Sequence, residues 1–228
     1  MNAAAVILAA TLATSLAALF GAPQIIERSL FRPYWFLRRR QYETIVTSGF
    51  VHADLSHLIF NLITYYFFAF QLQGQIGSAR FAALYLFGLV ASDVGTYFKH
   101  RNDPEYASLG ASGAISAMLF ASIVYFPWQK LFILPFPVPI PAPLFAIGYV
   151  AYSWYSARHP KGRINHDAHL GGALAGLAFV LLTDPGAYTR LLSWASAPTT
   201  GPMVMTQPLE ANSLFPSQTS EILPWMML

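Results

Sequence analysis

The sequence predicts an all-α polytopic membrane protein with six transmembrane helices, and three observations support this prediction. Of the 228 residues, 55% are hydrophobic and only 10% are charged, whereas a soluble domain carries about a quarter charged residues. The mean hydropathy is positive, at +0.46. Apolar runs approaching the roughly 20 residues that a helix needs to cross a bilayer recur along the chain. The length suits about one domain.

Composition also excludes several classes of site and partner. The chain contains no cysteine, so disulfides, thiolate nucleophiles and cysteine-ligated metals are excluded. The net charge of +3 comes from residues scattered in loops, which suits a membrane surface better than nucleic acid. We therefore expect the lipid bilayer as a partner, and neither nucleic acid nor a cofactor.

The first predicted span, residues 1–20, carries no charge. A cleaved signal peptide is the alternative, but such peptides start with a basic region, and the first basic residue here is Arg28. The connection that follows, residues 21–56, is long and rich in arginine and aromatic residues. That composition predicts a partly helical segment lying in the membrane interface.

Five further spans are predicted, at about 57–72, 81–98, 112–126, 144–157 and 166–182. A polar turn at 73–80 separates the second span from the third. Five prolines between positions 135 and 143 predict an extended lead-in to the fifth span. Residues 1–185 form the predicted membrane domain, and residues 186–228 are predicted to be a flexible tail.

Polar groups inside spans indicate a functional site. His57 and Asn61 are four residues apart at the start of the second span and share one helix face. Ser112 begins the fourth span and His169 lies near the start of the sixth. Because even-numbered spans run in the same direction, these side chains are expected at a similar depth on one side of the membrane.

The chemistry that this set suits is acyl transfer. A serine hydroxyl needs a neighbouring base to become a nucleophile, and His169 is placed to serve Ser112. The positive end of a helix dipole disfavours imidazolium and favours a developing oxyanion. His57 and Asn61 can donate further hydrogen bonds to that oxyanion.

Small residues predict close helix packing around this site. Gly172 and Gly176 form a small-xxx-small face on the sixth span. Gly113 and Ala117 give the fourth span a matching face, and Gly110 precedes the nucleophile. We predict these glycines as packing support that lets a serine and a histidine on neighbouring helices approach.

These residues resemble the rhomboid intramembrane serine proteases. Residues 110–113 (GASG) resemble the nucleophile motif of that family, residues 168–172 (AHLGG) its base motif, and residues 52–61 its H-x4-H-x3-N element. The resemblance covers about residues 40–185. It implies a six-helix bundle with a water-filled cavity. It also implies an enzyme that cleaves transmembrane segments of protein substrates. It also implies Ser112 as nucleophile, His169 as general base, and His57 with Asn61 as oxyanion donors.

Two features depart from that family. Some members have an aromatic residue one turn after the nucleophile that stacks on the base, and Ser116 stands there. No carboxylate is placed as a third member, because Asp167 falls elsewhere on the helix, so a Ser-His dyad is expected. Asp93, inside the third span, is interpreted as a buried structural partner, and His52 as support for its loop.

Two alternatives stay open. A catalytically silent relative would bind membrane clients with the same fold. A metal site could use His57, His166 and His169, although the glutamate base of the usual zinc-helix pattern is missing.

Orientation is contested. Ten basic residues fall on the side of the site and three on the other side: Arg28, Arg32, Arg38, Arg39, Arg40, Lys99, Arg101, Arg158, Lys161 and Arg163 against Arg80, Lys130 and Arg190. The positive-inside rule would turn the site towards the cytoplasm. The resemblance implies a bacterial plasma membrane with the site opening to the outer face, and we adopt that expectation. Substrate and oligomeric state are not predicted.

Overall fold

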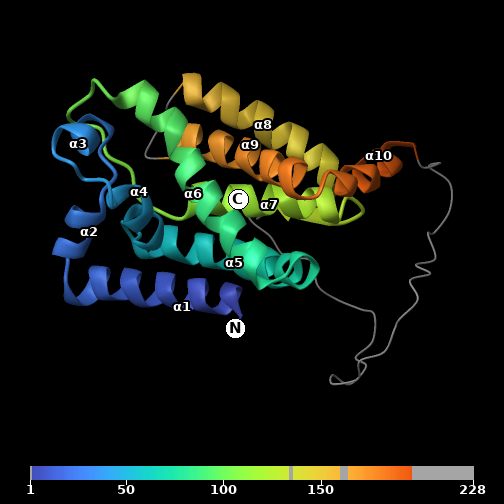
Figure 1. Cartoon of the computed structure of the whole chain (residues 1–228), viewed down its shortest axis with the longest axis horizontal. Coiled ribbons are helices and arrows are strands. Elements are labelled where there is room, and N and C mark those ends of the chain that lie inside the picture. Colours follow the sequence, from blue (N-terminus) through green and yellow to red (C-terminus); the bar gives the residue numbers. More distant parts are fainter. Residues whose placement is uncertain (1, 134–135, 160–163, 197–228) are drawn as a thin grey trace.

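The computed structural model describes residues 2–133, 136–159 and 164–196, which form a bundle of helices (Figure 1). Three helical segments in the described ranges are long and apolar enough to cross a membrane: Ala3–Gly21, Leu55–Ile76 and Ser78–His100. A fourth is added if the bent pair His166–Thr183 and Pro185–Ser196 counts as one span. A helical, membrane-spanning protein is thus confirmed, and the count of six spans stays a prediction.

The first helix is part of the bundle. Helix α1 (Ala3–Leu16) continues into the π-helical turn η1 (Ala17–Gly21). The Tyr65 hydroxyl donates to the Ala4 carbonyl at 3.0 Å, and the Thr14 hydroxyl donates to the Phe50 carbonyl at 2.5 Å. Both α1 groups therefore bind parts of the chain more than 30 residues away, as expected of a structural helix.

The long first connection is partly helical, as predicted. It contains the short helices α2 (Gln24–Ser29), α3 (Pro33–Arg38) and α4 (Thr44–Thr47) and the 3-10 turn η2 (Ser48–Phe50). Figure 1 shows α2, α3 and α4 gathered at one end of the bundle. Arginine side chains lie over aromatic rings on α3, with Arg38 4.0 Å from the Tyr34 centroid and Arg39 3.7 Å from that of Trp35.

Helices α5 (Leu55–Ile76) and α6 (Ser78–His100) are longer than predicted. The polar turn expected at 73–80 was wrong: only Gly77, at φ +82°, interrupts the helices. Gln73 lies within α5, and its side chain binds the start of α1 and the residue that caps it. Its side-chain Oε1 accepts from the Ala4 amide at 2.7 Å, and its Nε2 donates to Asn2 Oδ1 at 2.8 Å.

Helix α7 (Ser112–Tyr125) runs through the centre of the bundle, and each of its residues after Ser112 is buried. At 14 residues it rises only about 21 Å. Helices α6 and α9 (His166–Thr183) pack along it. Figure 1 places α7 among α5, α6 and α9. A helix surrounded by protein in this way need not match the full thickness of the hydrocarbon.

The proline-rich segment forms an antiparallel hairpin of β1 (Lys130–Ile133) and β2 (Phe136–Pro141). The extended lead-in is therefore confirmed, but it ends earlier than predicted. Pro143 lies in the first turn of α8 (Ala142–Arg158), where a missing N–H costs no helical hydrogen bond.

The predicted tail contains a helix that the sequence analysis missed. After the 3-10 turn η3 (Pro185–Ala187), helix α10 (Tyr188–Ser196) packs against α7. The Tyr188 hydroxyl donates to the Leu177 carbonyl at 2.6 Å, and the Trp194 ring lies 6.5 Å from that of Trp128. The half-buried residues Tyr188, Leu191 and Trp194 recur every third position. This run of three is too short to predict a helix from the sequence. The rest of that tail, 197–228, lies outside the described residues.

Candidate active site

Ser112 is the first residue of α7, and the loop before it is fixed at three points. Ser108 and Phe31 exchange two backbone hydrogen bonds of 3.0 Å, and the Gly110 amide donates to the Ser48 carbonyl at 2.9 Å. The Ala111 amide donates to Nε2 of His52 at 3.3 Å. The backbone that carries Ser112 is thus attached to the first connection on both sides of Gly110.

Gly110 is required at its position for two reasons. Its φ is +122°, a conformation that strains any residue with a Cβ. A Cβ built there would also lie 2.5 Å from Cε1 of His57. The imidazole of His57 therefore rests against the backbone two residues before Ser112.

His52 is fully buried and links α1 to this loop. Because Nε2 accepts from the Ala111 amide, Nδ1 carries the proton and donates to the Ser15 hydroxyl at 3.0 Å. That hydroxyl in turn donates to the Phe50 carbonyl at 3.1 Å. Burial lowers the pKa of His52 to about 3, in keeping with a neutral ring in this tautomer. The interpretation of His52 as loop support agrees with these contacts.

The first two turns of α5 hold the two predicted oxyanion donors, His57 and Asn61. The Asp54 side chain caps the helix by accepting from the His57 amide at 2.8 Å. The His57 ring meets the His52 ring edge to face, with centroids 4.9 Å apart. Asn61 is 8% exposed, and its Nδ2 donates to the His57 carbonyl at 2.9 Å. That bond uses one of its two amide protons.

Helices α7 and α9 approach almost backbone to backbone. A Cβ on Gly172 would lie 2.1 Å from the Gly113 carbonyl oxygen, and one on Gly176 would lie 2.0 Å from that of Ala117. A Cβ on Gly113 would meet Ser92 Oγ at 2.2 Å and the Ala168 carbonyl at 3.5 Å. The small-residue faces of the two helices therefore meet, and the first turns of α7 and α9 lie side by side.

His169 lies in the first turn of α9, one residue after Ala168, whose carbonyl faces Gly113. Asn165 caps the helix by accepting from the Ala168 amide at 3.0 Å. Asp167 pairs with Lys99 at 2.7 Å, so the carboxylate nearest in sequence is engaged elsewhere. Within the described ranges, neither Ser112 nor His169 has a side-chain hydrogen bond. Catalytic hydrogen bonds are often long or unformed without substrate.

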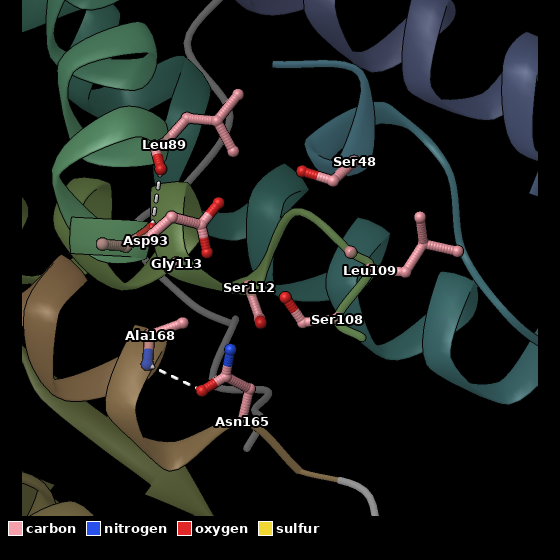
Figure 2. A pocket seen from close by; sticks show the side chains of 11 residues that line it. Ser48, Leu89, Asp93, Ser108, Leu109, Ser112, Gly113, Asn165 and Ala168 are labelled. Atoms are coloured by element: carbon pink, nitrogen blue, oxygen red, sulfur yellow. Dashed lines mark hydrogen bonds between the residues drawn. The ribbon is translucent and has the colours of Figure 1, made fainter. Parts of the chain in front are cut away.

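A small cavity of about 20 Å³ lies beside Ser112 (Figure 2), enough for about one ordered water. Figure 2 shows Ser112 near Ser108 and Asn165, which come from different parts of the chain. Six of the eleven residues that line the cavity have hydroxyl, amide or carboxyl side chains: Ser48, Ser92, Asp93, Ser108, Ser112 and Asn165. His57, Asn61 and His169 are not part of this lining.

Sequence reasoning missed several of these residues. Ser48, Ser108 and Asn165 carry no motif and reach the cavity only through the fold. Asp93 was interpreted as a structural partner. Its side chain lines the cavity at 6% exposure, and its carboxyl group makes no ion pair or hydrogen bond to any other described residue.

The metal alternative gains no support from side-chain placement. Among the residues that the structure describes, no group of three or more His, Asp or Glu side chains is arranged to hold a metal ion. The rings of His166 and His169 meet edge to face, with centroids 5.9 Å apart.

Comparison with known proteins identifies a family whose model covers all three motifs, at residues 52–61, 110–113 and 168–172. The model of the Rhomboid domain matches residues 39–185. The chain belongs to the rhomboid family. The matched residues include α5 to α9, the helices that carry the candidate site. Members of this family are generally intramembrane serine proteases.

Curated relatives place the chain within a diverse rhomboid family. It is 30% identical over 145 residues to RHOMBOID-like protein 12, mitochondrial, of Arabidopsis thaliana, covering 57% of this chain and 43% of that one. It is 28% identical over 173 residues to Rhomboid protein 1, mitochondrial, of Saccharomyces cerevisiae, covering 71% and 49%. It is 37% identical over 71 residues to Putative rhomboid protease YdcA of Bacillus subtilis, covering 31% and 35%.

This rhomboid chain spans less than half the length of these relatives. Two of the three are named as mitochondrial proteins. The chain is an integral membrane protein, and a bacterial plasma membrane remains only a prediction.

Proposed function

We propose that this rhomboid protein is an intramembrane serine endopeptidase in which Ser112 is the nucleophile and His169 the general base. The observation that carries the proposal is the meeting of two helix starts. The first turn of α7, which holds Ser112, contacts the first turn of α9, which holds His169, at Ala168 and packs at glycine distance on Gly172 one turn further along. The loop before Ser112 is also held by backbone bonds to Ser48 and Phe31.

The reaction is acyl transfer from a peptide bond within a transmembrane substrate. Ser112 Oγ attacks the scissile carbonyl carbon while His169 accepts the hydroxyl proton. The tetrahedral intermediate collapses when His169 returns that proton to the leaving amine. A water then attacks the Ser112 ester by the same route, releasing the carboxylate product and the free serine.

The oxyanion is stabilised by donors at the head of α7. The N-cap residue is Ala111, which makes no side-chain cap, so the N–H groups of the first turn have no such acceptor. They and the helix dipole favour negative charge there. His57 adds its ring N–H, since its imidazole lies against Gly110. Asn61 adds its second amide proton.

The membrane arrangement belongs to the same proposal. We assign α7 and α8 as spans in addition to the three long helices and α9, which gives six. The starts of α5, α7 and α9 then lie on one side, and the site opens there. The membrane concerned is a bacterial plasma membrane, with the site on its outer face.

A fluorophosphonate probe tests the proposal on the full chain in detergent. We expect covalent labelling at Ser112 that is abolished in Ser112→Ala and in His169→Ala. Chelator-sensitive activity without labelling would favour the metal alternative. Retention of a transmembrane client by an unlabelled protein would favour the catalytically silent relative.

A further inference from the structure

The orientation of the His169 ring poses a question that the sequence left open. Residue 116, one turn after Ser112, is a serine and offers no ring to stack on the base. Asp167 is paired with Lys99. In the described part of the chain, no hydrogen bond fixes the His169 imidazole.

An aromatic ring from another helix lies beside the His169 imidazole. Tyr149 on α8 and His169 have nearly parallel rings, with an interplanar angle of 16° and centroids 6.3 Å apart. This separation is within the range of offset-stacked aromatic pairs. Tyr149 is 5% exposed, so solvent does not compete for this contact.

The same tyrosine is anchored to the nucleophile's helix. Its hydroxyl and that of Ser116 are joined by a hydrogen bond of 2.7 Å. Its ring also packs on Phe120 of α7, with centroids 5.3 Å apart, and on Phe145 of α8, at 5.9 Å. Tyr149 therefore contacts α7 one turn after Ser112 and α9 at the base.

We propose that Tyr149 is the positioning residue for the catalytic base: its ring, supplied by α8 and anchored by Ser116, holds the His169 imidazole in the orientation that accepts the Ser112 proton. Position 116 thus supplies no aromatic ring of its own. Its serine hydroxyl instead holds the ring of Tyr149 in place. This inference rests on the proposed function, since it assigns His169 as the base.

The test is the kinetics of fluorophosphonate labelling of the full chain in detergent, separating the maximal labelling rate from the probe concentration at half saturation. Tyr149→Leu is expected to lower the maximal rate about tenfold with half saturation unchanged. Tyr149→Phe keeps the ring and is expected to stay within about threefold of wild type. If the leucine variant does not fold, Tyr149→Met, with its adaptable side chain, takes its place.

Phe145→Leu is the matched control, because it removes a buried ring from the same helix and cluster without a ring contact to His169. It is expected to label at close to the wild-type rate, while its thermal midpoint falls as far as that of Tyr149→Leu. The inference is overturned if Tyr149→Leu labels like wild type. It is equally overturned if Phe145→Leu or Tyr149→Phe slows labelling as much as Tyr149→Leu does. A wild-type protein that does not label would instead remove the proposed function itself.

Discussion

At the scale of single residues, His52 supports the loop that carries Ser112, the proposed nucleophile. It is fully buried, accepts a hydrogen bond from the Ala111 amide and donates one to Ser15. A protonated ring could not accept from Ala111. The position of Ser112 therefore depends on a neutral histidine that is bound to α1.

Acidification should expose this dependence. Burial lowers the pKa of His52 from 6.5 to about 3, so the unfolded chain takes up this proton at a pH where the folded protein does not. The folded state thus loses stability as pH falls from 6.5 towards 3, by about 2 kcal/mol at pH 5. Thermal unfolding midpoints in detergent at pH 7 and pH 5 measure this loss, and His52→Gln should show a smaller difference between them. An equal difference in both proteins would remove His52 as the cause.

Gly110 gives a second prediction at this scale. Gly110→Ala combines a strained φ of +122° with a Cβ that would lie 2.5 Å from Cε1 of His57. We expect a destabilisation of about 2 kcal/mol and loss of fluorophosphonate labelling, because the variant displaces both the loop and His57. Gly148→Ala is the matched control, since a Cβ there has no neighbour within 4 Å. A fully active Gly110→Ala protein would contradict the packing described.

At the scale of elements, the contact between α7 and α9 determines the distance between Ser112 and His169, the proposed nucleophile and base. The two helices meet where glycine leaves carbonyl oxygens uncovered, at Gly172 against Gly113 and at Gly176 against Ala117. Added methyl groups would force the helices apart, and a shift of about 1 Å can cost a hundredfold in rate.

Gly172→Ala and Gly176→Ala should therefore lower the labelling rate of Ser112 more than they lower the amount of folded protein. Gly172 is nearer the site, and we expect the larger loss there, about a hundredfold. Gly95→Ala, on α6 with open space at its Cβ, serves as control and should label normally. If both α9 variants label at the wild-type rate, close helix contact is not what aligns the dyad.

At the scale of the whole molecule, the bundle of α5 to α9 could be predicted from the sequence because apolar runs and small-residue spacing are local patterns. Gly172 and Gly176 identified the packing face, and Ser112 the head of a buried helix. Tyr149 could not be predicted, because nothing local distinguishes it from other aromatic residues in apolar helices. Likewise, Gln73 falls within the predicted turn, because the Ala4 amide that its side chain binds lies 69 residues earlier in the chain. Such contacts depend on how distant helices meet, which local patterns do not encode.

Orientation in the membrane gives a prediction for the whole chain. The chain has no cysteine, so Thr200→Cys provides a single label site, in a segment outside the described residues. We expect a membrane-impermeant maleimide to leave it unlabelled in intact cells and to label it after lysis. Labelling from outside would reverse the proposed orientation and agree with the charge distribution.

The central claim is that Ser112 and His169 together hydrolyse a peptide bond within the membrane. The most direct measurement is cleavage of a transmembrane reporter co-reconstituted with the purified protein in liposomes, with the cut site identified by mass spectrometry. The wild-type protein should cut within the reporter's transmembrane segment, while Ser112→Ala and His169→Ala should give no product. Equal processing by Ser112→Ala would contradict the assignment of this rhomboid protein as a serine protease.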